Sequence, residues 1–233
     1  SGAVNRKQKA FKDLGVDPFG RDVEILSPVI VDLVRRDAAR MGKRGERGTV
    51  TFCTTVDAYT PASVSHGIPR ACAEAILGLT QLDLRILTKN PAVVGDYDLF
   101  QRYPGRVTVG FSMGTLDEKF AAVVEYGTPS IRGRLEGYRR AKEAGLRTYG
   151  MFCPYWPGEH ETEADFIKWF DRTAEFGFER VWAEVPNLRG PNLVNTGNAL
   201  RDAGMADRAR LVETMGPKGS WSAYARRSTL ALL

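Results

Sequence analysis

The chain has 233 residues, a length suited to one α/β domain, and 43% of them are hydrophobic, which is enough for a sizeable core. Its formal charge of +5 permits an anionic partner without requiring one, and the sequence has no apolar run long enough to span a bilayer. The three cysteines are too few and too scattered for a disulfide scaffold and, with no recognisable signal peptide, favour a reducing cytoplasm.

The first half of the chain predicts alternating strands and helices. We expect strands where β-branched and aromatic residues cluster, and helices where apolar residues recur every three to four positions. In chain order, the predicted elements are a strand over 22–26, a helix over 28–41, a strand over 49–55, a helix over 68–79, a strand over 84–88 and a helix over 96–103. The Asn90-Pro91 pair ends the last of these strands, because it is a typical turn signal.

The second half repeats this alternation, with glycine at the joints. Predicted here are strands over 106–112, 146–153 and 180–185, and helices over 115–125, 130–144 and 163–176. Thr115 is expected to cap the first of these helices, while Gly145 and Gly177 follow the other two and lead directly into strands. Repeated helix–glycine–strand joints indicate parallel strands with helices outside, as in an α/β barrel.

The composition changes after Pro186, where Asn, Gly, Pro and Arg become frequent. Two helices are predicted there, near 196–203 and 206–215. We therefore expect a barrel-like domain over 1–190 and a C-terminal extension over 191–233 that packs on it. The extension contains aromatic and basic residues that either bind a nucleic-acid strand or belong to an ordinary amphipathic tail; these are Trp221, Tyr224, Arg226 and Arg227.

Reactive and polar residues stand at the predicted strand ends, where α/β barrels carry their chemistry. The strand over 49–55 ends with Cys53, Thr54 and Thr55, and Asp57 follows it. Cys53 is either a small core residue or a thiol in a site, and Asp57 is also suited to begin a turn. Lys89 ends the next strand, where it either holds a carboxylate or phosphate as a point charge or is a solvated surface lysine.

The remaining strand ends are polar as well. Ser112 ends the third strong strand, and Cys153 begins a loop over 153–158 that either forms the wall of a flat ligand's site or only packs the rim. Glu184 and Asn187 follow the last strand. A carboxylate and an amide suit the hydroxyl or amino groups of a ligand, although exposed polar residues at a rim are equally common.

Four stretches, which together cover roughly residues 20–190, carry a family resemblance. They are TFCTTVDAYTP at 51–61, RILTKNPAVVGDYDLF at 85–100, the stretch over 107–158, and AEVPNL at 183–188. This combination resembles the radical S-adenosylmethionine superfamily, and within it the spore photoproduct lyase-like branch. The resemblance implies an α/β fold, a partial (β/α)6 TIM-like barrel that lacks its first strand and cluster loop in this chain and carries a C-terminal helical extension.

The resemblance also implies a chemistry. Members of the family bind a four-iron (4Fe-4S) cluster and S-adenosylmethionine in the barrel mouth. Reductive cleavage of the cofactor gives a 5′-deoxyadenosyl radical, which abstracts a hydrogen atom from the substrate. For this chain, the resemblance implies a cytoplasmic, lyase-like enzyme with S-adenosylmethionine as cofactor, an external electron donor, no membrane partner, and a nucleic acid as one candidate substrate.

Individual roles follow from the same resemblance. Lys89 matches the strand-end lysine that meets the methionine carboxylate, and Ser112 matches a residue near the ribose. Glu184 and Asn187 would lie near the adenosine end. Cys53 falls where the lyase carries a thiol that returns a hydrogen atom to the product, a role that suits the weak S–H bond. The residues expected to line the methionine side are Thr54, Thr55 and Asp57.

The cysteines depart from the family pattern. The family holds its cluster with Cys-x3-Cys-x2-Cys, whereas here 18 residues separate Cys53 from Cys72 and 80 separate Cys72 from Cys153, which cannot hold a cluster locally. Either the cluster loop is missing from this chain or the lineage has dispensed with the cluster. Two functions therefore stay open, a radical S-adenosylmethionine enzyme and a non-radical barrel that binds S-adenosylmethionine, a nucleotide or nucleic acid.

Overall fold

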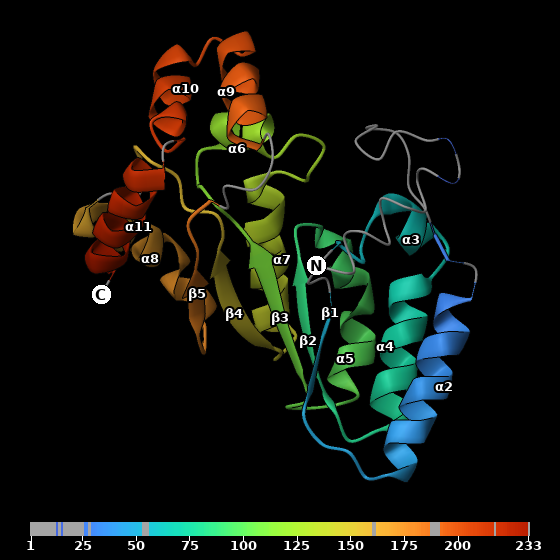
Figure 1. Cartoon of the computed structure of the whole chain (residues 1–233). Helices are drawn as coiled ribbons and strands as arrows, with labels where there is room; N and C mark the ends of the chain where they lie inside the picture. The colour runs from blue at the N-terminus through green and yellow to red at the C-terminus, as the bar shows by residue number, and fades with distance from the viewer. Residues whose placement is uncertain are drawn as a thin grey trace.

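The described part of the chain contains a parallel five-stranded sheet that curls into half of a barrel (Figure 1). The computed structural model describes residues 13, 15, 26, 27, 29–52, 56–159, 162–186, 192–216 and 218–232. The strands pair in sequence order, which confirms the predicted partial barrel. The strand predicted over 22–26 lies outside the described residues except for Leu26. The strands are β1 (Thr49–Phe52), β2 (Asp83–Thr88), β3 (Val107–Ser112), β4 (Arg147–Phe152) and β5 (Val181–Ala183).

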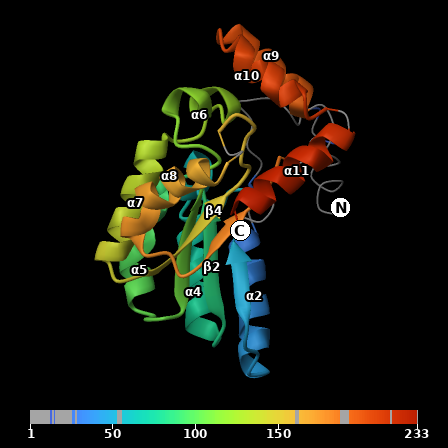
Figure 2. The same ribbon diagram turned by 90° about the vertical axis from the view of Figure 1, so that its left-hand side faces the viewer.

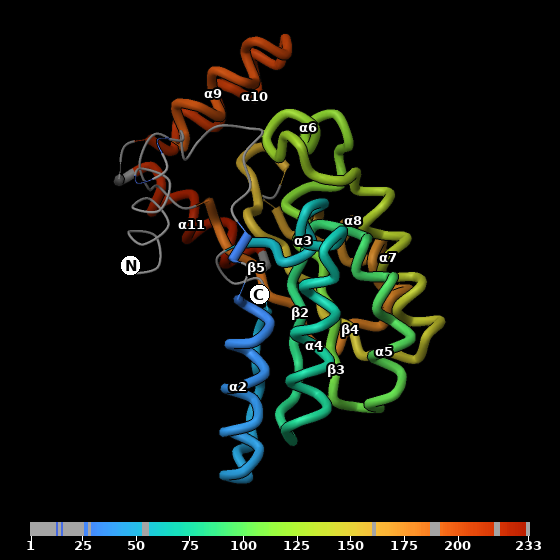
Figure 3. The backbone as a smooth tube through the Cα atoms, turned by 90° about the vertical axis from the view of Figure 1, so that its right-hand side faces the viewer, coloured from blue at the N-terminus to red at the C-terminus, as the bar shows by residue number. Residues whose placement is uncertain are grey.

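Helices cover one face of this sheet, and the main core lies between the two layers (Figure 2). In β2, side chains alternate between half-buried and buried positions, so Leu84 and Ile86 point into that core. Tyr138 and Trp169 meet them from the helix layer and are 0% and 2% exposed. The covering helices are α4 (Ile68–Leu79), α5 (Tyr97–Gln101), α7 (Ile131–Glu143) and α8 (Glu163–Thr173), while α2 (Ile30–Lys43) packs against α4 (Figure 3).

The predicted joints between helices and strands are present. Gly145 has a φ of +71° and Gly177 a φ of +61°, the left-handed conformation in which glycine ends a helix without steric cost. The helix predicted over 115–125 begins later, as α6 (Glu118–Val124), because Asp117 rather than Thr115 caps its first backbone N–H groups. The helix predicted over 96–103 is α5, preceded by a 3-10 turn over Pro91–Asp96 that the Asn90 side chain caps.

The short helix α3 (Pro61–Ser65) and the turn Ala174–Phe176 complete the barrel part, and three helices follow it: α9 (Asn192–Asp202), α10 (Ala206–Glu213) and α11 (Lys218–Leu232). Figures 1 and 2 show α9 and α10 beside α6, at the end of the molecule where the strands end. The sequence predicted α9 and α10 but not α11.

Helix α11 and its neighbours are tied to the loops that follow β4 and β5. The Tyr224 hydroxyl donates a hydrogen bond to the Tyr155 carbonyl (3.1 Å), and Trp221 Nε1 donates to the Pro186 carbonyl (2.9 Å). Arg208 Nη2 on α10 lies 3.2 Å from Oε1 of the buried Glu159 carboxylate, so an ion pair joins α10 to the loop after β4.

Whether residues 191–233 form a separate part, as the sequence predicts, stays a prediction. None of the helices in the described residues is long and apolar enough to cross a membrane.

Candidate functional site

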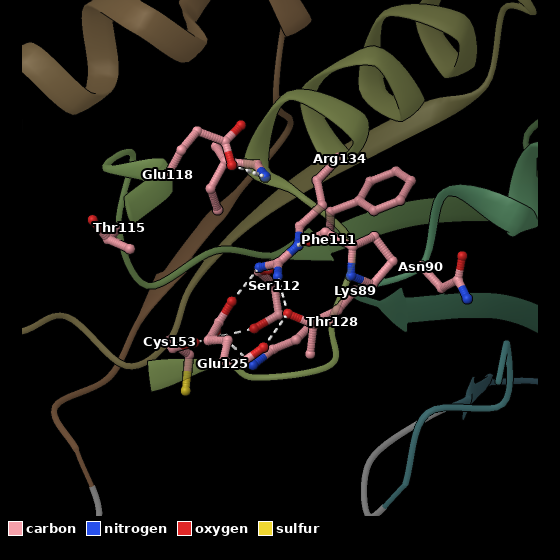
Figure 4. A network of polar contacts seen from close by, with 12 residues as sticks. Lys89, Asn90, Phe111, Ser112, Thr115, Glu118, Glu125, Thr128, Arg134 and Cys153 are labelled. Atoms are coloured by element: carbon pink, nitrogen blue, oxygen red, sulfur yellow. Dashed lines mark hydrogen bonds and ion pairs between the residues drawn. The ribbon is translucent and has the colours of Figure 1, made fainter. Parts of the chain in front are cut away.

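The parallel sheet brings those predicted strand-end residues that the structure describes to one edge. Ser112 pairs with Met151, and Phe152 pairs with Ala183, so β3, β4 and β5 end side by side. The Ser112 hydroxyl donates a hydrogen bond to the Cys153 carbonyl at 3.1 Å. The Cys153 thiol in turn lies 3.7 Å from Glu184 Oε2 and donates to it. These contacts connect the ends of three neighbouring strands, and Figure 4 shows Ser112 and Cys153 within the same network as Lys89.

A buried ion pair holds Lys89 at this edge. The Lys89 ammonium donates to Glu125 Oε1 at 2.6 Å, and Arg134 Nη1 donates to Glu125 Oε2 at 2.5 Å (Figure 4). The Glu125 side chain is 4% exposed and that of Arg134 is fully buried, whereas that of Lys89 is 31% exposed. Two cations thus share one carboxylate, and of the two it is the Lys89 side chain that solvent reaches.

Arg134 donates its other hydrogen bonds to two backbone carbonyls and one side-chain hydroxyl. Its guanidinium donates to the carbonyl oxygens of Ser112 and Pro129 and to the Thr128 hydroxyl, at 2.9, 3.1 and 2.7 Å. A buried arginine requires such partners, because an unpaired charge in the interior is costly. The guanidinium therefore ties the end of β3, the end of α6 and the start of α7 together behind the strand-end edge.

Asp57 connects the loop after β1 to the end of β2. Its carboxylate accepts hydrogen bonds from the Thr88 hydroxyl at 2.7 and 2.8 Å, from Lys89 N at 2.8 Å and from Tyr59 N at 2.9 Å. The backbone that carries Lys89 is fixed by these bonds. The predicted contact between Asp57 and the methionine part of a ligand stays a prediction.

The Cys153 thiol is held in its protonated form. Burial, and next to it the negative charge of Glu184, raise its pKa to about 11. At neutral pH this cysteine therefore carries an S–H bond and is a poor nucleophile. Cys72, by contrast, lies in the buried face of α4, where burial also raises its pKa, and it belongs to the core.

Some predicted residues cannot be placed. Cys53, Thr54, Thr55 and Asn187 lie outside the described residues, so their roles stay predictions. Among the predicted residues, the structure brings together Asp57, Lys89, Ser112 and Glu184 through the chain of contacts given above.

Glu125 and Arg134 were not predicted as site residues. Arg134 stands one position before Leu135 on a helix whose predicted apolar face includes Ile131 and Tyr138, and it is as buried as they are. A charged residue next to an apolar face is the one sequence signal that points to it. Glu125 has no such signal, because its contact with Lys89 spans 36 residues of sequence.

The side chains present do not provide a metal centre. In the described part of the chain, no three His, Cys, Asp or Glu residues gather closely enough to hold a metal ion. With 18 and 80 residues between its three cysteines, the chain does not fit the ligand set of a four-iron cluster. The polar groups at the strand-end edge suit an organic ligand such as the expected S-adenosylmethionine: an ammonium can meet a carboxylate, and hydroxyl and carboxylate oxygens can meet hydroxyl and amino groups.

A cavity of about 570 Å³ opens away from this edge, between α7 and α8. Its lining combines apolar side chains with charged ones, among them Ile131, Arg132, Lys168 and Arg172. None of the predicted site residues lines it.

No family model matches the chain. Among curated proteins, ORF301 of Acidianus two-tailed virus is 32% identical over 154 residues, which is 65% of this chain and 50% of that protein. MJ0683 of Methanocaldococcus jannaschii is 25% identical over 111 residues, which is 48% of this chain and 42% of that protein. Both are uncharacterized, and the chain spans about half their length or less.

Solved structures of spore photoproduct lyase share the fold. A variant with bound AdoMet and dinucleoside spore photoproduct superposes with a TM-score of 0.56 at 20% identity, over 74% of this chain and 52% of that one. The lyase complexed with dinucleoside spore photoproduct gives a TM-score of 0.55 at 20% identity, over 82% and 55%. The chain therefore has the half-barrel fold of these enzymes, across about half of their length.

Proposed function

We propose that the strand-end edge binds S-adenosylmethionine and that the chain forms the cofactor-binding half-barrel of a radical S-adenosylmethionine enzyme. One observation carries the proposal: a partly exposed lysine side chain directly after β2, whose ammonium pairs with a buried carboxylate that a buried arginine also contacts. An ammonium has three N–H groups, and among the described residues the Lys89 ammonium donates only to Glu125. The other N–H groups can receive the methionine carboxylate without breaking the ion pair.

The remaining contacts follow from the order of the strands. Ser112, at the end of β3, which pairs with the strand that leads into Lys89, would contact the ribose. Glu184 at the end of β5, with Asn187 beyond it, would contact the adenosine end. On the opposite side, Asp57 together with Thr54 and Thr55 would line the methionine part.

The radical step lies beyond the residues of this chain. S-adenosylmethionine bound with a reduced four-iron cluster supplies a 5′-deoxyadenosyl radical that abstracts hydrogen, and the chain's cysteines do not fit such a cluster. Hydrogen abstraction is therefore proposed for the chain together with whatever segment or protein supplies the cluster. Cys53 is proposed as the thiol that returns a hydrogen atom, and Cys153, which holds its proton at neutral pH, is a second candidate. The dinucleoside bound by a structural neighbour supports a nucleic-acid substrate.

Isothermal titration calorimetry tests cofactor binding directly. Lys89→Ala should weaken S-adenosylmethionine binding by about 1.5–3 kcal/mol, which is the scale of a hydrogen bond to a charged group. It should not weaken binding of 5′-methylthioadenosine, which lacks the amino-acid part. Lys119→Ala, at an exposed lysine on α6, is the matched control and should change neither affinity. An unchanged S-adenosylmethionine affinity in Lys89→Ala would remove Lys89 from the site.

A non-radical barrel that binds the same cofactor, a nucleotide or nucleic acid is the second candidate, and the cysteine spacing favours it. Anaerobic reconstitution with iron and sulfide separates the two. A broad visible absorption that dithionite bleaches supports the radical enzyme. Its absence from the complete natural protein, with S-adenosylmethionine still bound, supports the second candidate.

A further inference from the structure

The inner face of the half-barrel, opposite the helix layer, carries an arginine within cation–π distance of two aromatic rings. Arg85 on β2 alternates with Leu84 and Ile86, which point into the core on the other side of the sheet. The Arg85 Cζ atom lies 4.9 Å from the ring centre of Trp182 and 5.7 Å from that of Tyr149. The two rings meet edge to face, with centres 5.2 Å apart. We call these three side chains the Arg85 platform.

The platform is built into the sheet. Tyr149 is 4% exposed, and its ring lies over Gly110 on the neighbouring strand, where an added Cβ would come within 2.5 Å of the ring. Glycine at this position therefore makes room for the tyrosine. The Arg85 guanidinium lies within cation–π distance of both rings, which stabilises its position on this face of the sheet.

Arg85 forms no ion pair and donates no hydrogen bond within the described part of the chain. Its side chain is nevertheless partly buried. Other arginines of the sheet region are paired: Arg147 makes a bidentate contact with Glu179, at 2.6 and 2.7 Å, and Arg106 donates to three carbonyl oxygens. A half-buried guanidinium with free donors is suited to receive an oxyanion, because its planar fork matches carboxylate and phosphate oxygens.

The platform lies next to the proposed cofactor edge. Trp182 pairs with Met151, which pairs with Ser112. Glu184 comes directly after β5, two residues beyond Trp182. Arg85 stands four residues before Lys89 on β2. A molecule bound on the platform would therefore lie against the inner face of the sheet, next to the strand-end edge.

We infer that Arg85 binds an oxyanion of the substrate, a phosphate or a carboxylate, with Trp182 and Tyr149 holding the guanidinium in place. The inference deepens the proposed function, on which it rests, because it states the chemical class of the substrate: an organic anion. Phosphate and carboxylate share this recognition chemistry, and the probes below distinguish them.

The test compares charged and neutral probes by calorimetry at low salt. Thymidylyl-thymidine carries one phosphodiester, thymidine carries no charge, and succinate carries only carboxylates. If the substrate anion is a phosphate, the wild-type chain should bind thymidylyl-thymidine at least about tenfold more tightly than thymidine; if it is a carboxylate, the chain should bind succinate. In either case, Arg85→Gln should abolish the preference for the charged probe. Arg85→Lys keeps the positive charge but loses the planar pair of N–H donors, so it should retain only part of the affinity for the charged probe. Arg147→Gln is the matched control, because Glu179 already neutralises Arg147.

The outcomes separate the two proposals. A phosphodiester preference that depends on Arg85 supports a phosphate-bearing substrate, and succinate binding that depends on Arg85 supports a carboxylate-bearing one. Equal binding of thymidylyl-thymidine and thymidine together with no succinate binding, or an equal loss in Arg147→Gln, overturns the inference. A separate titration of S-adenosylmethionine into the wild-type chain tests the proposed function. If the cofactor does not bind, the proposed function is overturned, while the Arg85-dependent binding of the charged probes can still be judged.

Discussion

Replacing Glu125 by glutamine tests the buried ion pair behind the strand-end edge. The substitution keeps the shape of the side chain but removes its negative charge. Lys89 and Arg134 then face a neutral amide across the two oxygen positions that they now share, 2.6 and 2.5 Å away. One half of the new amide is an NH2 group, so at least one of the two cations meets a donor instead of an acceptor.

The size of the loss follows from the burial of the three side chains. Removing one partner of a buried ion pair costs about 3–5 kcal/mol, because it leaves a buried charge without compensation. Arg134 keeps its bonds to the Ser112 and Pro129 carbonyls, and the Lys89 side chain, 31% exposed, can turn towards water. We therefore expect the lower end, about 3 kcal/mol, which for a chain of this size lowers Tm by about 6–12 °C.

Urea denaturation followed by circular dichroism measures the free energy of unfolding, and calorimetry gives Tm. Glu136→Gln is the control, since this exposed carboxylate pairs with Arg139 on the surface of α7 and should leave Tm almost unchanged. A loss below about 1 kcal/mol for Glu125→Gln, on the scale of an ordinary hydrogen bond, would refute the charge-based reasoning.

Two further predictions concern the thiol and the inner face of the sheet. Because Glu184 helps to raise the pKa of Cys153 to about 11, Glu184→Gln should lower that pKa. Iodoacetamide at pH 9 should then alkylate Cys153 several times faster, as measured by peptide mass spectrometry. An unchanged alkylation rate would mean that Glu184 has no electrostatic effect on the thiol. Gly110→Ala should reduce the free energy of unfolding by about 1–3 kcal/mol, because the new methyl group overlaps the Tyr149 ring. Gly133→Ala, where a Cβ meets ordinary contacts at 3.4 and 3.5 Å, is its control, and equal effects of the two substitutions would contradict the packing argument.

The sheet could be predicted because its signals are local. Each strand has its own run of β-branched and aromatic residues, and the joints at Gly145 and Gly177 need only one residue in the left-handed conformation. The helix predicted over 68–79 matches α4 at both ends. Predicting that polar residues gather at one edge required only the rule that parallel strands end on the same side.

The remaining features depend on contacts that no local pattern specifies. Helix α11 has a weak amphipathic pattern, and its position depends on distant partners such as Tyr155, 69 residues away from Tyr224. The Lys89–Glu125 contact likewise joins two elements 36 residues apart. Arg85 was not predicted as a functional residue, because the rings that hold it come from β4 and β5.

A crystal structure of the chain with S-adenosylmethionine tests the central claim most directly. We expect the methionine carboxylate to accept hydrogen bonds from the Lys89 ammonium while Glu125 and Arg134 stay paired behind it. The adenosine should lie between Ser112 and Glu184. A cofactor bound elsewhere, for example in the cavity between α7 and α8, with Lys89 unchanged, would contradict the claim.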